Sequence, residues 1–234
     1  MRRLLVAALA AAPLAVYAGV AAAWSDRDLF YRLVAEDRLF EWLQVVGYGL
    51  AALGFVVLAL VLRSRSRLGT LAAVGGALLF AVVIGEELSW GQRHWDVRLA
   101  AVERVNDQGD LTLHNVGAGL ALSQVGLLGV ALAGLTAPFL HRIGPLRRRI
   151  PEVARFTPPI WLAGWFAAAA AFTVARLTVL PTPPFQVAKL SEVAELSVAA
   201  GAAVVVGLAI RAALSLPIRA GTRDGGARPS VAAP

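Results

Sequence analysis

Apolar residues gather in six long stretches that short polar segments separate. The stretches are Leu4–Trp24, Leu43–Leu62, Leu68–Leu88, Val116–Leu140, Trp161–Leu180 and Leu190–Leu214. Each has about the 20 residues that a helix needs to cross the hydrocarbon core of a bilayer. An open sheet cannot satisfy its backbone in lipid, and no alternating pattern typical of a barrel strand occurs. The pattern predicts an all-α, polytopic membrane bundle of six helices over residues 1–214.

The composition agrees with lipid as the solvent. Hydrophobic residues make up 58% of the chain and charged residues 16%, whereas soluble domains have about 45–50% and about 25%. The chain has no cysteine, which excludes disulfides, thiolate metal ligands and a cysteine nucleophile. Residues 215–234 are rich in Gly, Pro, Ala and Arg and lack apolar periodicity, which predicts a disordered cytoplasmic tail.

The charges between the stretches alternate in sign. With the N-terminus inside, 14 of the 22 Arg and Lys residues fall on the inner side, and 13 of the 15 Asp and Glu residues fall on the outer side. The positive-inside rule then predicts a multi-pass protein of the plasma membrane with both termini in the cytoplasm. This placement accounts for the net charge of +7, so nucleic acid is not an expected partner. Membrane lipid is expected, and no feature identifies a protein partner.

The first stretch has a second interpretation. Arg2 and Arg3, an apolar run and the small residues Ala21, Ala22 and Ala23 are typical of a secretory signal with its cleavage site. However, the apolar run has about 20 residues, and signal cores have about 7–15. We therefore expect a retained transmembrane helix. Cleavage stays the alternative, and it would leave five helices in the same orientation.

Every stretch after the first brings ionisable groups to the predicted outer side. The candidate site residues are Glu86, Glu87, Arg93, His114, Glu192 and Glu195. Charge near hydrocarbon is costly and usually faces the bundle interior, so we expect these groups to converge. Glu192 and Glu195 are three residues apart and share a helix face, which Lys189 extends.

Simpler interpretations of the same residues stay open. Carboxylates at a membrane surface are often only solvated, and Glu192 and Glu195 could serve the dipole of their helix. Arg176 with Glu192 could form a structural ion pair. Glu86, Trp90 and Arg93 follow helical spacing, which suggests that they lie on one helix face. Gly85 precedes them, where it would allow close approach of a neighbour.

Two motifs resemble an uncharacterised bacterial family of multi-pass membrane proteins. They are the run GEELSWGQR at residues 85–93 and the run NDQGDLTLHN at residues 106–115. The resemblance covers residues 36–119 and, weakly, 176–195. Asp110 and Thr112 stand where the resemblance leads us to expect Glu and Asn. It implies that these residues form one unit and carries no established activity.

Several mechanisms are excluded by missing motifs. The chain has no GxxxxGK[ST] phosphate loop, no GxSxG elbow and no HExxH zinc motif. Only three histidines occur, and His141 falls on the opposite face from His114. A zinc site of three histidines on the outer side is therefore excluded. Glu87, His114 and Glu192 form a candidate set for a divalent metal, because their oxygen and nitrogen donors suit such ions.

Three functions stay open. The first is an enzyme on lipid or lipid-linked substrates, with a glutamate as general base, a metal as Lewis acid and Arg93 holding a phosphate. The second is a non-catalytic protein for assembly or partner binding. The third, a transporter, is less favoured because the inner halves of the helices offer almost no ionisable group for a relay.

Overall fold

The structure is a computed structural model that describes residues 2–35, 38–92, 112, 119–149, 156–179 and 184–217. Helices dominate these residues, and no strand occurs among them. Six helices are long and apolar enough to cross a membrane. They are α1 (Arg2–Ala23), α3 (Leu39–Leu62), α4 (Arg67–Glu87), α7 (Gly119–Thr136), α10 (Ala163–Thr178) and α12 (Ser191–Leu214). The predicted all-α fold with six such helices is confirmed.

Short helical elements join the long ones. They are α2 (Arg27–Val34), η1 (Ser89–Gly91), η3 (Ala137–Arg142), α8 (Gly144–Arg149), η4 (Ile160–Leu162) and α11 (Phe185–Ala188). The Asp26 side chain caps α2 by accepting a hydrogen bond from the Leu29 backbone N–H at 3.0 Å. The α7 helix ends before the predicted Leu140, and η3 follows it. Pro138 lies at the start of η3, where its missing N–H cannot continue the α-helical bonding.

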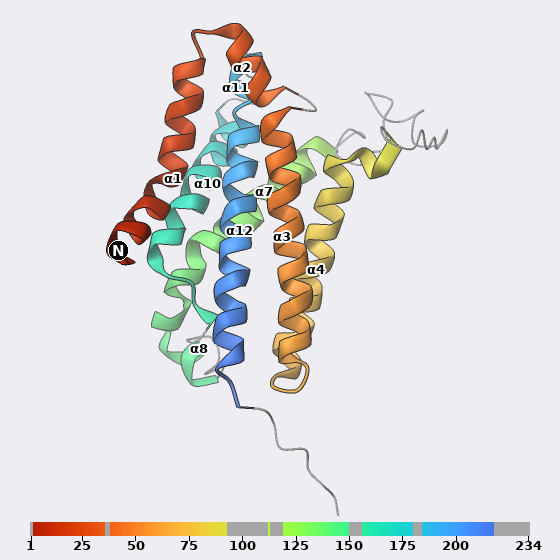
Figure 1. Cartoon of the computed structure of the whole chain (residues 1–234), viewed down its shortest axis with the longest axis vertical. Coiled ribbons are helices and arrows are strands. Elements are labelled where there is room, and N and C mark those ends of the chain that lie inside the picture. Colours follow the sequence, from red (N-terminus) through yellow and green to blue (C-terminus); the bar gives the residue numbers. More distant parts are fainter. Residues whose placement is uncertain are drawn as a thin grey trace, which may run out of the picture.

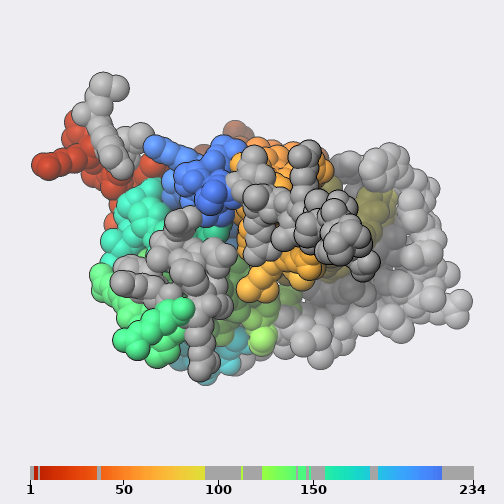
Figure 2. Space-filling view, turned by 90° about the horizontal axis from the view of Figure 1, so that it is seen from below, coloured from red at the N-terminus to blue at the C-terminus, as the bar shows by residue number. Residues whose placement is uncertain are grey.

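Successive long helices alternate in direction along the chain, so that α3, α7 and α12 run one way and α1, α4 and α10 the other (Figure 1). The end of the bundle that holds α2 and α11 is called the upper end here, from its place in Figure 1. The turn between α3 and α4 and the α8 helix lie at the other end. Figure 2 shows α12 between α10 and α3, with α1 at the edge. The polar groups at the start of α12 therefore face other helices.

Glycines let α12 approach its neighbours closely. A Cβ added at Gly47 on α3 would lie 2.9 Å from the Cβ of Ala199 on α12. The ring of Phe166 on α10 fills the space beside both Gly134 on α7 and Gly201 on α12. Small residues are the usual means of tight helix contact in lipid, where the hydrophobic effect does not drive helices together. Here they bring α3 and α10 against opposite sides of α12.

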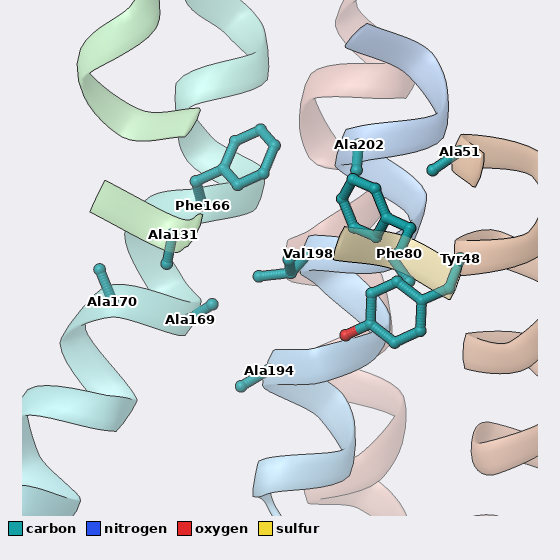
Figure 3. Close-up of a cluster of buried hydrophobic side chains, with 11 residues drawn as sticks. Tyr48, Ala51, Phe80, Ala131, Phe166, Ala169, Ala170, Ala194, Val198 and Ala202 are labelled. Carbon is teal, nitrogen blue, oxygen red and sulfur yellow. The ribbon is translucent and has the colours of Figure 1, made fainter. Parts of the chain in front are cut away.

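A cluster of buried apolar side chains fills the middle of the bundle. Tyr48 on α3 stacks with Phe80 on α4, with ring centroids 5.8 Å apart. Figure 3 shows the Tyr48 hydroxyl pointing toward α12, and Phe166 among small residues of α7 and α10. The upper half of α1 belongs to a second cluster, in which Val20 packs with Phe30 of α2 and Val193 of α12. The first helix is thus packed into the bundle.

Candidate functional site

Two polar side chains of α3 bind the first turns of α12. Gln44 is fully buried, with 0% of its surface exposed. Its Nε2 donates to the backbone carbonyl of Glu192 at 2.8 Å and to Glu192 Oε2 at 3.0 Å. One turn further, the Tyr48 hydroxyl donates to the Glu195 backbone carbonyl at 3.2 Å. The upper ends of α3 and α12 are therefore joined by hydrogen bonds as well as by packing.

The Glu192 carboxylate is held from two sides. Lys189 Nζ lies 3.3 Å from Glu192 Oε1, while Gln44 Nε2 binds the other carboxylate oxygen. The structural ion pair between Arg176 and Glu192 that the sequence suggested is wrong, because Glu192 pairs with Lys189. Lys189 ends α11 and precedes Glu192 by one turn, so local spacing brings the two together without a rearrangement of helices.

Glu195 lies one turn further into the bundle. Its carboxylate interacts electrostatically with Glu87 of α4, Glu192, Lys189 and Glu41 of α3. No side chain in the described segments donates a hydrogen bond to it. The four glutamates and Gln44 are called the carboxylate cluster below. Glu87 and Glu192 thus lie within electrostatic range of Glu195, and a common site of these residues stays a prediction.

The amide oxygen of Gln44 points to a missing partner in this cluster. Gln44 Oε1 is buried and has no hydrogen-bond partner among the residues that the structure describes, although the Nε2 of the same amide binds Glu192 Oε2. An amide oxygen only accepts hydrogen bonds or coordinates a cation. A buried polar atom without a partner costs about 1–3 kcal/mol. The cluster therefore offers an acceptor for a proton donor or a cation that the described residues do not supply.

Glu86 faces a different environment from Glu87. Trp90 Nε1 donates a hydrogen bond to Glu86 Oε1 at 2.7 Å. The Trp90 ring also covers Gly85, where an added Cβ would lie 2.8 Å from it. Glu86 thus holds the turn that follows α4, and Glu87 reaches the carboxylate cluster. Gly85 allows the close approach expected from the sequence, and the neighbour is Trp90.

The turn after α4 is left-handed. Ser89, Trp90 and Gly91 have φ angles of 47°, 51° and 83°. This region costs a non-glycine residue roughly 1–2 kcal/mol, and such strain often marks functional sites. The expected helical stripe of Glu86, Trp90 and Arg93 is wrong, because α4 ends at Glu87. Trp90 meets Glu86 because the chain turns back.

Two candidate residues, Arg93 and His114, lie outside the described residues, as does Asp110. Their convergence with the carboxylate cluster stays a prediction. Among the residues that the structure describes, no group of three His, Cys, Asp or Glu is placed to hold a metal ion. The described carboxylates are therefore not placed to hold a metal by themselves. The predicted metal set of Glu87, His114 and Glu192 depends on His114.

The sequence interpretation missed Gln44 and Tyr48 as site residues. A signal was present, because Glu41, Gln44 and Tyr48 follow helical spacing at the start of an apolar stretch. This polar stripe faces α12 in the structure. No protein-family model, curated protein or solved structure matches this chain. The geometry of the carboxylate cluster therefore carries the functional argument.

Proposed function

We propose that this protein is an integral membrane enzyme that acts on lipid or lipid-linked substrates at the outer leaflet, with Glu195 as its general base. The position of Glu195 carries the proposal. Its carboxylate lies inside the bundle beside Glu87 and Glu192, and no described side chain donates a hydrogen bond to it. Lone pairs that no protein donor occupies are available for a substrate proton.

The neighbours of Glu195 have supporting roles in this proposal. Gln44 and Lys189 fix Glu192, and Gln44 Oε1 accepts a hydrogen bond from the substrate hydroxyl or amine. Glu87 closes the site from α4. A divalent metal, if the protein binds one through His114, would polarise a phosphoryl or carbonyl oxygen. Arg93 would hold a substrate phosphate.

The cellular location is part of the proposal. The excess of Arg and Lys at the ends of the stretches supports a plasma-membrane protein with both termini in the cytoplasm. The carboxylate cluster then faces the extracytoplasmic side. The use of 21 Arg against a single Lys, together with the resemblance of the two motifs, supports a bacterial source.

The test uses the full chain in nanodiscs that contain a total bacterial lipid extract. The lipids are analysed by mass spectrometry after incubation with wild type, Glu195→Gln or Asp28→Asn. Asp28 is an exposed carboxylate on α2 at the same end of the bundle, so its variant controls for loss of surface charge. We expect one lipid class to change with wild type and Asp28→Asn but not with Glu195→Gln. Identical lipid profiles for wild type and Glu195→Gln would contradict the enzyme.

An exposed aromatic residue favours a second candidate, a non-catalytic protein for partner binding. The left-handed turn and Glu86 hold Trp90 with 46% of its surface exposed, and tryptophan is enriched in the energetic centres of interfaces. Chemical cross-linking in native membranes, compared between wild type and Trp90→Ala, separates the two functions. A protein adduct that Trp90→Ala removes, with no lipid change in the nanodisc assay, would favour the second candidate.

A further inference from the structure

The exposed apolar face of α3 has the height of one hydrocarbon core. Trp42, with 45% of its surface exposed, precedes this face, and the exposed Arg63 follows it. Trp42 and Arg63 are 21 residues apart, which is about 31 Å along a helix, and a hydrocarbon core is about 30 Å thick. Tryptophan is enriched at membrane interfaces, and arginine near helix ends reaches for them. Exposed apolar side chains between the two include Leu43, Val46, Leu50, Leu53, Val57 and Leu60.

The neighbouring helix α4 gives the same height. It begins at Arg67, beside the lower end of α3, and ends at Glu87. These two residues are 20 positions apart, which is about 30 Å. Trp90, with 46% of its surface exposed, follows at the upper end. Two antiparallel helices therefore support one upper boundary of the hydrocarbon, at the level of Trp42 and Glu87.

Hydrogen bonds to α3 give the depth of the carboxylates on α12. Gln44 lies about 3 Å below Trp42 along α3, and it binds Glu192. Tyr48 lies about 9 Å below Trp42, and its hydroxyl donates to the Glu195 carbonyl. Side chains tilt toward the N-terminus of their helix, which for α12 is the upper end (Figure 1). Both carboxylates therefore lie within about 9 Å of the boundary, whereas the middle of the bilayer is about 15 Å from it.

We propose that the carboxylate cluster lies at the level where the polar head group of a lipid joins its chains, and that the enzyme acts on this linkage. The choice of substrate rests on the function proposed above, while the depth rests on Trp42, Arg63 and Glu87. The ester and phosphate oxygens of a lipid lie at the boundary of the hydrocarbon core, so they are close in height to Glu195. The middle and the ends of the chains lie deeper. The substrate class is therefore a lipid whose ester or phosphoester linkage changes while its chains stay intact.

Nitroxide labels on single cysteines measure the depth, because the chain has no cysteine of its own. Leu39→Cys, Leu43→Cys and Leu50→Cys place labels at exposed positions of α3. Relaxation by oxygen and by a water-soluble nickel chelate is compared in nanodiscs by EPR spectroscopy. We expect nickel to dominate at position 39 and oxygen at position 50, with position 43 between them. Leu60→Cys, near the lower boundary, is the matched control and should resemble Leu43→Cys. A label at position 50 that is open to nickel, or one at position 43 that is equally deep, would overturn the proposal.

The lipids that change in the nanodisc assay show which bond reacts. Tandem mass spectrometry measures the head group and each chain separately, after incubation with wild type or Glu195→Gln. We expect wild type alone to change the head group or the number of chains, with the mass of each chain unaltered. A chain that gains or loses hydrogen or oxygen would overturn the substrate class and leave the enzyme in place. No lipid change at all would contradict the enzyme, and the label depths would still decide where the cluster lies.

Discussion

The Trp165 indole on α10 supplies the hydrogen bond that α1 cannot make for its own Leu9 carbonyl. The distance from Trp165 Nε1 to the Leu9 oxygen is 2.9 Å. In a regular helix this carbonyl accepts from the N–H four residues later. That residue is Pro13, which has no N–H. A contact between helices thus repairs a defect within one helix, and it fixes where α1 lies against α10.

This contact predicts a coupling between residues on two helices. Trp165→Phe should lower the free energy of unfolding by about 1–3 kcal/mol, because it leaves the Leu9 carbonyl without a donor. In a Pro13→Ala background, the new N–H of residue 13 can serve that carbonyl, so the same change should cost less. Unfolding by SDS titration of the four proteins of this double-mutant cycle measures the coupling. Additive effects would show that Trp165 acts by packing alone.

Two buried glutamines, Gln44 and Gln124, should differ in how much they stabilise the protein. Gln44→Leu should lower the free energy of unfolding by about 1–3 kcal/mol, because Glu192 loses a donor to its carbonyl and to its carboxylate. Gln124 on α7 is also buried, at 8% exposure, but its amide makes no hydrogen bond within the described part of the chain, whereas the Gln44 amide makes two. Gln124→Leu should therefore be neutral or stabilising. Equal losses for the two variants, measured by SDS titration, would contradict the role of Gln44 as a link to α12.

Alanine substitutions at three glycines test the structure of the left-handed turn. Gly91→Ala should cost about 1–2 kcal/mol, since Gly91 has a φ of 83°. Gly85→Ala should displace the Trp90 ring and change its fluorescence, because the new methyl group would lie 2.8 Å from the ring. Gly75→Ala on the same helix meets nothing within 4 Å and should stabilise slightly. An unchanged Trp90 emission in Gly85→Ala would place the ring elsewhere.

The orientation in the membrane is tested with reporter fusions. Fusions after Arg67 and Arg149 should be active as cytoplasmic reporters, because basic residues flank those positions. Fusions after Arg32 and Arg104 should be active as extracytoplasmic reporters. A reversed result at either pair would overturn the proposed orientation while leaving the six helices in place.

The six long helices were predictable because each carries a continuous apolar run of membrane length. The turn after α4 was not, because the spacing of Glu86, Trp90 and Arg93 also suits a continuing helix. Gly91 was the local hint, since its φ of 83° favours glycine. Whether a helix continues there depends on the Trp90 contacts with Gly85 and Glu86, which form only when the chain turns back.

The site was predictable in part. The sequence placed Glu87, Glu192 and Glu195 at one end of the bundle, since the ends of neighbouring membrane helices alternate sides. It did not assign Gln44 to the site, because that requires knowing that α3 lies against α12. The closeness of these helices depends on the contact between Gly47 and Ala199, and pairs of small residues occur on many helices without meeting.

The central place of α12 has a consequence for the order of synthesis. This helix is the last of the six to leave the ribosome, yet Gln44 and Tyr48 of α3 rely on it for their hydrogen bonds. Until it inserts, the earlier helices hold these polar side chains in lipid without their final partners. A ribosome that stops before Ser191 therefore releases a chain with a polar, unfilled centre. Completion of the final helix therefore supplies the hydrogen-bond acceptors that the centre of the bundle lacks until then.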